Sequence, residues 1–347
     1  MLSKNGLPLK IQYCVRCNLS NQQPTSTNEY FHTKNTKQKT VKFDDKGVCA
    51  ACNFNDLKWN KKIDWEEREK ELVDLCNKYR KDNGEYDCLI GGSGGKDSVY
   101  QSWILKYKYK MNPLTVTWAP HIYTDVGWSN FQKWINKGGF DNYLFTPNGK
   151  IHRKVSREST INLLHPFQPF IIGQKTFCQK MADRFDIPII FYGEMPGEGG
   201  KNISHKIKKF GTSEGNEAQK GFEIDPLEGK KFEEAYIGGK QVQEYLDAGI
   251  SKNDLHCYKP LDPTIIQKKK IQFYFLGYFL RWVPQENYYF ACEKIDFSPN
   301  SQRTEGTYQK YQSIDDKMDG FFFYTRFIKF GVGRTMMDSS QEIRNGH

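Results

Sequence analysis

The chain has 347 residues and a formal net charge of +10, with 37% apolar and 15% aromatic residues. That apolar content supports a buried core and excludes wholesale disorder, and the length indicates a main domain with smaller modules. No apolar run is long enough to span a bilayer, and residues 1–6 lack the apolar stretch of a signal peptide, so we expect a cytoplasmic protein. The basic charge fits nucleic acid, a nucleotide-bearing substrate or an acidic partner, and does not choose among them.

Residues 1–60 contain two Cys-x-x-Cys pairs, formed by Cys14, Cys17, Cys49 and Cys52. This spacing lets both thiolates of a pair reach one tetrahedral metal ion, and reduced thiols in the cytosol make disulfides the weaker interpretation. We therefore predict a structural zinc module, with an iron–sulfur cluster or redox pairs as alternatives. His32 lies between the pairs, and we expect it to be a solvated loop histidine.

Asp64 is a plausible N-cap for a helix that joins this module to the main domain. Strands and helices then alternate, with strands expected at 86–91, 114–118, 142–146 and 187–193 and helices at 97–109, 130–137, 151–164 and 172–185. This alternation predicts an α/β fold over residues 61–195, with a parallel sheet and helices on both of its faces.

Residues 196–347 are predicted to be an insertion followed by a C-terminal region that binds substrate or a partner. The glycine-rich stretch from residue 194 to about 240 indicates a long loop. The apolar stretch 271–282 indicates a buried strand pair or a core helix. Cys178, on the last predicted helix of the α/β domain, fits a packing role better than a catalytic thiol.

The segment Gly92-Ser93-Gly94-Gly95-Lys96-Asp97-Ser98 connects a predicted strand to a predicted helix. Glycines there present backbone N–H groups to an anion, and the helix adds the positive end of its dipole. Ser93 and Ser98 offer hydroxyls to phosphate oxygens, Lys96 adds a positive charge, and Asp97 suits a magnesium ion or its water. A plain glycine turn is the alternative. The spacing is not that of the Walker loop.

The string Ser-Gly-Gly-Lys-Asp-Ser resembles the loop of the ATP pyrophosphatase (PP-loop) superfamily, Ser-Gly-Gly-x-Asp-Ser. The resemblance implies that the loop holds the β,γ-pyrophosphate of ATP while a substrate oxygen attacks the α-phosphate. An adenylated intermediate forms, pyrophosphate leaves, and a nucleophile then displaces AMP.

Further motifs extend over essentially the whole chain, at 13–17, 43–52, 88–98, 113–120, 148–150, 165–170, 191–194, 303–308 and 313–317. Together they resemble the N-acetyl sugar amidotransferase family of pseudaminic acid and lipopolysaccharide biosynthesis. That resemblance implies ATP-dependent conversion of a sugar N-acetyl group to an acetamidino group. It also implies a nucleotide-linked or acidic N-acetylated sugar as substrate, and ammonia from a separate glutaminase subunit.

The resemblance gives each candidate residue a role. Gly92 to Ser98 bind ATP phosphates, and Lys96 also stabilises the leaving pyrophosphate. Thr117 and Trp118 lie where the superfamily places adenine. Gly193 and Glu194 end the fourth predicted strand, where Glu194 serves as a base for ammonium, a magnesium ligand or an ordinary solvated carboxylate. Arg303 and Glu305 contact the substrate or form a surface salt bridge.

Two other functions remain open from the sequence. A tRNA thiolation enzyme shares the loop, a metal module and the basic charge, although the cysteines of the main domain are isolated here. A non-catalytic zinc-ribbon interaction protein with a decayed nucleotide site is the other, and the intact Ser93 and Asp97 argue against it.

Overall fold

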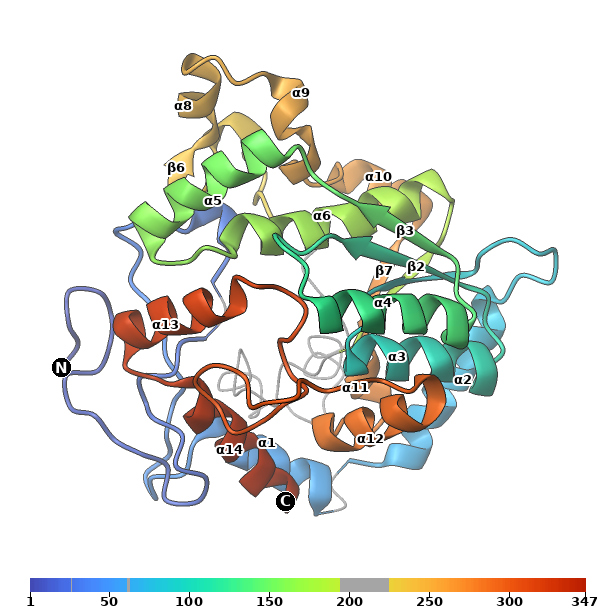
Figure 1. Ribbon diagram of the computed structural model, residues 1–347, viewed down its shortest axis with the longest axis horizontal. Coiled ribbons are helices and arrows are strands. Elements are labelled where there is room, and N and C mark those ends of the chain that lie inside the picture. The colour runs from blue at the N-terminus through green and yellow to red at the C-terminus, as the bar shows by residue number, and fades with distance from the viewer. Residues whose placement is uncertain (26, 61–62, 194–224) are drawn as a thin grey trace.

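A five-stranded sheet lies at the centre of the computed structural model, which describes residues 1–25, 27–60, 63–193 and 225–347 (Figure 1). All its strands are parallel, in the spatial order β3-β2-β1-β4-β7. Their bounds are β1 Cys88–Gly91, β2 Pro113–Trp118, β3 Asn142–Phe145, β4 Ile189–Tyr192 and β7 Gln272–Phe275. The predicted α/β fold with a parallel sheet is therefore confirmed.

Helices cover both faces of this sheet, with α5, α6 and α10 on one side and α2, α3 and α4 on the other (Figure 1). Their bounds are α2 Trp65–Tyr79, α3 Lys96–Trp103, α4 Asp125–Gly138, α5 Gly149–Leu163, α6 Gln168–Arg184 and α10 Pro263–Lys269. The other α-helices of the described residues are α1 Ala50–Trp59, α8 Val242–Asp247, α9 Lys252–Leu255, α11 Leu276–Phe279, α12 Pro284–Ile295, α13 Asp319–Phe330 and α14 Arg334–Asn345.

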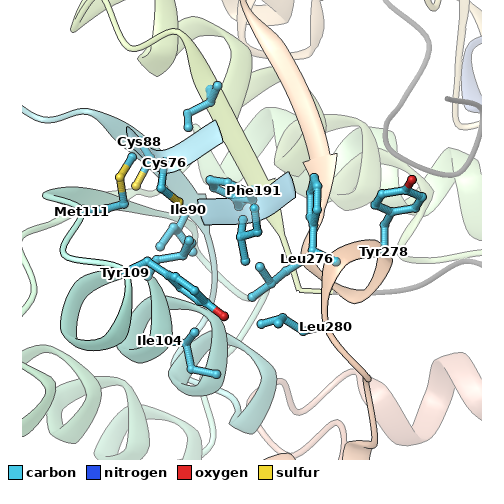
Figure 2. Close-up of a cluster of buried hydrophobic side chains, with 14 of the residues drawn as sticks. Cys76, Cys88, Ile90, Ile104, Tyr109, Met111, Phe191, Leu276, Tyr278 and Leu280 are labelled. Atoms are coloured by element: carbon cyan, nitrogen blue, oxygen red, sulfur yellow. The ribbon is translucent and has the colours of Figure 1, made fainter. Parts of the chain in front are cut away.

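Alternate residues of β1 point to opposite faces, as strand geometry requires. Leu89 packs with Met181 and Ala182 of α6. Cys88 and Ile90 belong to the cluster on the other face, which Figure 2 shows with Cys76 of α2 and Leu276 of α11. Side chains on both faces of β1 are fully buried, which explains why this strand is a continuous apolar run in the sequence.

Helix boundaries follow local capping. The side chain of Asp64 accepts hydrogen bonds from the N–H groups of residues 66 and 67, so the predicted N-cap of α2 is confirmed. Helix α4 begins at Asp125, five residues before the predicted start, because the Thr124 hydroxyl caps it by accepting from Gly127 N at 3.0 Å. Helix α3 continues into a π-helical turn, Ile104–Lys108.

The sheet extends beyond the sequence-predicted α/β segment. Within 271–282, the residues Gln272–Phe275 form β7, which pairs in parallel with β4, and Leu276–Phe279 form the short helix α11. The stretch is buried as expected, but it is one strand and one helix. The division of the chain at residue 195 stays a prediction, and of the long loop expected from residue 194 onward, residues 194–224 lie outside the described part.

The N-terminal segment and the last helix pack together. Asn55 of α1 donates to the backbone carbonyl of Arg344 in α14 at 2.5 Å, and Ser340 Oγ donates to the Cys17 carbonyl at 2.6 Å. Lys58 is 1% exposed, and its Nζ donates to the Trp282 carbonyl at 2.6 Å and to Asn345 Oδ1 at 2.9 Å. Among the helices described, none is both long and apolar enough to cross a membrane.

We expect Lys58→Ala to lower the free energy of unfolding by about 2 to 3 kcal/mol, because it removes charge-assisted hydrogen bonds and leaves buried acceptors unpaired. Urea denaturation followed by circular dichroism measures the change. Lys70→Ala, at an exposed position of α2, is the matched control and should shift stability by less than about 0.5 kcal/mol. Equal effects of the two substitutions would contradict the buried role of Lys58.

Candidate functional site

The glycine-rich loop lies where the topology of the sheet reverses. From β1, the strands β2 and β3 follow on one side, and β4 and β7 follow on the other. Open parallel sheets bind ligands at the carboxyl ends of the strands at such a point. Gly92 follows β1 and Gly193 follows β4, and both line a cavity of about 520 Å³. This size is ordinary for a small-molecule site.

The loop has a constrained backbone. Gly94 has a φ of +83°, and a Cβ there would come within 2.6 Å of the Phe131 Cα in α4. Ser93 N donates to Ser98 Oγ at 3.0 Å, which closes the turn. The N-cap of α3 is Gly95, which has no side chain to cap the first-turn N–H groups. These N–H groups and the helix dipole together favour an anion at the loop.

Two side chains from later in the chain support the loop. Asn287 of α12 donates from Nδ2 to Asp97 Oδ1 at 3.0 Å, while the other carboxylate oxygen of Asp97 is 2.6 Å from Lys96 Nζ. Asp315 hydrogen-bonds with Ser93; burial raises the pKa of this carboxyl, and the hydrogen bond opposes the rise. Asp315 belongs to the motif at 313–317, from which the sequence alone gives it no role. Asn287 belongs to none of the sequence motifs.

The cavity collects many of the predicted residues. Gly92, Ser93, Asp97, Ser98, Trp118 and Gly193 all line it. Trp118 is 3% exposed and its indole Nε1 has no hydrogen-bond partner, so it offers a donor to a ligand. Cys178 also lines the cavity, where burial raises the pKa of its thiol to about 12. A neutral thiol fits the packing role expected for it.

Other predicted residues lie elsewhere. The buried Lys96 and the glycines Gly94 and Gly95 belong to the loop but do not line the cavity. Thr117 is buried in β2, where its hydroxyl accepts from Asn142 Nδ2 at 3.0 Å. Arg303 and Glu305 are exposed and do not line the cavity either. Glu194 lies outside the described residues.

Segments remote in sequence complete the cavity. Glu29 and His32 of the N-terminal module line it, together with His165 and with Arg326 and Lys329 of α13. His32 is 6% exposed, so the expectation of a solvated loop histidine was wrong. The reason is that residues 28–32 fold onto α6: Gln168 Nε2 donates to the Glu29 carbonyl at 2.9 Å.

The four N-terminal cysteines converge as predicted. Their sulfur atoms all lie within 4.8 Å of one another, with Cys14–Cys52 at 3.7 Å and Cys17–Cys49 at 3.6 Å. Within the described residues they are the only group of three or more His, Cys, Asp or Glu side chains arranged to hold a metal ion. Arg344 of α14 donates to the Cys17 sulfur at 3.3 Å, a contact that suits a thiolate ligand.

Comparison with known proteins gives limited similarity. No protein-family profile matches the chain. Over 85 residues it is 38% identical to the uncharacterized protein MJ1599 of Methanocaldococcus jannaschii, a match that covers 24% of this chain and 29% of that relative. The chain thus spans less than a third of the relative's length.

Solved structures resemble this chain only weakly. One is the U34-tRNA thiolase NcsA of Methanococcus maripaludis with its [4Fe-4S] cluster, at 12% identity and a TM-score of 0.36, covering 97% of this chain and 87% of that one. Another is the NH3-dependent NAD synthetase of Campylobacter jejuni, at 14% identity and a TM-score of 0.31, covering 60% and 93%. Similarity at this level carries no argument about function. The fold and the loop themselves define a parallel α/β protein whose switch point carries a glycine-rich turn with uncapped N–H groups.

We expect Gly94→Ala to weaken ATP binding by about tenfold or more, since the added Cβ forces the loop away from α4. Titration calorimetry with ATP measures the affinity. The matched control is Gly84→Ala, where φ is +84° but no atom lies within 4 Å of the added Cβ. That change should carry only the backbone strain of about 1 kcal/mol and leave ATP affinity intact. Normal ATP binding by Gly94→Ala would contradict the role of the loop.

Elemental analysis of the purified protein should find one metal ion per chain. Cys49→Ser should lose it and destabilise the protein, because the segment around the four thiols has few apolar residues to hold it together. Cys257→Ser, outside the cluster, should retain the full metal content. Full occupancy in Cys49→Ser would show that the four cysteines do not form the site.

Proposed function

We propose that this protein is an ATP-dependent enzyme that adenylates the carbonyl oxygen of a sugar N-acetyl group and replaces that oxygen with ammonia. The observation that carries the proposal is the loop Gly92–Ser98 at the switch point of a parallel sheet, opening into a cavity with room beyond the loop. The string of the loop supports splitting ATP between its α and β phosphates. The motifs along the chain support the sugar amide as acceptor.

The chemistry proceeds in two displacements. The amide oxygen attacks the α-phosphorus of ATP, the bond to the β-phosphate oxygen breaks, and pyrophosphate leaves with its electrons. Ammonia then adds to the imidate carbon, loses a proton, and the C–O bond breaks to release AMP and leave the amidine. Adenylation is necessary because oxide is a poor leaving group from an amide, whereas AMP is a good one.

Each supporting residue has a place in this scheme. The N–H groups of the loop and the first turn of α3 bind the β,γ-phosphates. Lys96, held at 2.6 Å from Asp97, neutralises charge on the departing pyrophosphate. Trp118 lines the cavity and provides a surface and a donor for adenine. Asn287 and Asp315 hold Asp97 and Ser93 in position.

The cysteine cluster fits zinc. A Zn–S distance of about 2.3 Å places the corners of a tetrahedron about 3.8 Å apart, close to the separations of 3.6 and 3.7 Å between the sulfur atoms here. Thiolates that each coordinate a different iron atom of an iron–sulfur cluster would lie farther apart than this. All four positions are filled by protein, so the role is structural.

Magnesium is the ion expected with ATP, and it would neutralise phosphate charge during displacement. Both carboxylate oxygens of Asp97 already have protein partners, Lys96 and Asn287. The ion would therefore be held mainly by phosphate oxygens, with Asp97 as the nearest side-chain ligand of the loop. Ammonia is proposed to come from a separate glutaminase subunit.

The test is incubation with ATP, magnesium, ammonium and a panel of N-acetylated nucleotide sugars and acidic N-acetyl sugars. We expect AMP, together with a product lighter than its parent because NH replaces O, by mass spectrometry. Asp97→Asn should lose AMP formation by about a hundredfold or more. AMP with tRNA and a sulfur donor, and none with any sugar, would instead establish the thiolation alternative. No binding of ATP would leave a non-catalytic protein.

A further inference from the structure

Part of the cavity lining comes from outside the phosphate loop and includes charged side chains that have no role in the ATP binding proposed above. It is made by Glu29, His32, His165, Arg326 and Lys329, and we refer to these five residues as the basic wall. They come from the N-terminal module, the turn after α5, and α13. Figure 1 shows α13 well separated from α3, so the cavity connects elements distant in both sequence and space.

The two cations of α13 have carboxylates only beyond ion-pair distance, Asp338 near Arg326 and Glu29 near Lys329. Arg326 donates from Nη2 to Gln23 Oε1 at 3.1 Å, while its Nε is buried without a hydrogen-bond partner. Lys329 Nζ donates to the Leu163 carbonyl at 2.8 Å, which leaves two of its three donors for a ligand. Neither forms an ion pair with any carboxylate of the described residues. Burial lowers the pKa of Arg326 to about 10 and lowers that of Lys329 as well.

The charged side chains that line the cavity leave an excess of positive charge near α13. Arg326 and Lys329 line the cavity together with the carboxylate of Glu29, whereas the carboxylate of Asp97 is already paired with Lys96. A partly buried cation without an ion-pair partner has lost hydration without compensation, and an anionic ligand supplies that compensation. The basic wall therefore suits an oxyanion.

Neutral and aromatic groups beside these cations suit a polar ring. Burial lowers the pKa of His165 to about 4, so its imidazole is neutral at pH 7, and its Nδ1 has no partner. Its ring stacks on Phe322 with centroids 5.3 Å apart. Glu29 Oε2 is 3.8 Å from His32 Nδ1, and neither atom has a hydrogen-bond partner. These atoms can bind hydroxyl groups of a ligand.

We propose that the basic wall is the acceptor subsite, in which Arg326 and Lys329 bind a carboxylate or phosphoryl group of the acceptor while the glycine-rich loop holds ATP. The identification of the bound anion as the acceptor rests on the proposed function. The anion site itself can be tested by binding, without catalysis. It predicts that the acceptor carries an anionic group at a distance from its N-acetyl group.

The test measures binding to the full chain saturated with α,β-methylene-ATP, which fills the loop and cannot be cleaved. Three probes are titrated by calorimetry: N-acetylneuraminic acid for a carboxylate, UDP-N-acetylglucosamine for phosphoryl groups, and uncharged N-acetylglucosamine. We expect one anionic probe to bind about tenfold or more tighter than the uncharged sugar, and its identity distinguishes a carboxylate from a phosphoryl acceptor. Arg326→Gln should abolish this preference, and Arg326→Lys should restore part of it.

Arg184→Gln is the matched control, because it removes the same side chain at an exposed position of α6 outside the cavity. Each variant must still bind α,β-methylene-ATP, which shows that it is folded. Equal binding of the anionic probes by wild type and Arg326→Gln would overturn the subsite, as would no preference for either anion in the wild type.

Measuring AMP formation in parallel separates the two proposals. Binding that depends on Arg326, without AMP from any N-acetylated sugar, would uphold the anion subsite and overturn the adenylation proposal. AMP formed at the same KM by wild type and Arg326→Gln would uphold adenylation and overturn the subsite.

Discussion

The contact between Gly94 and the backbone of Phe131 is the constraint on which the site depends. A side chain of any size at residue 94 would collide with α4, so the turn between β1 and α3 can follow only one path. That path places the uncapped first turn of α3 at the carboxyl ends of β1 and β4, where the order of the strands reverses. Fixed N–H dipoles at this edge need no rearrangement when an anion arrives, and preorganisation of this kind is what makes electrostatic stabilisation effective.

Much of the fold could be predicted because its signals are local. Leu89, Cys88 and Ile90 are apolar on both faces of a strand, and Asp64 caps a helix by bonds to its own next residues. The glycine-rich loop is equally local. Strand β7 was harder, because its pairing with β4 joins residues some eighty positions apart and because it is only four residues long, three of them aromatic, which does not distinguish a strand from a buried helix.

Within the site, the phosphate loop, Trp118 and Gly193 could be predicted, whereas the residues that the N-terminal module and the C-terminal helices contribute could not. Asn287 meets Asp97, and Arg326 meets Gln23, only because helices from the end of the chain return to the sheet and to the N-terminal module. His32 shows the same limitation: a polar, glycine-poor stretch suggests a solvated loop, and only the docking of residues 28–32 on α6 buries it. The spacing of apolar residues within a segment does not predict such long-range contacts.

The hydrogen bond from Arg344 to the Cys17 sulfur links the cysteine cluster to a helix 327 residues away in the sequence. All four thiols belong to residues 14–52, whereas the guanidinium beside them belongs to α14. The cluster can therefore acquire its cationic neighbour only when α14 docks beside α1. The electrostatic environment of the thiols is thus a product of tertiary folding, and a substitution that loosens α14 should change their reactivity without altering any cysteine.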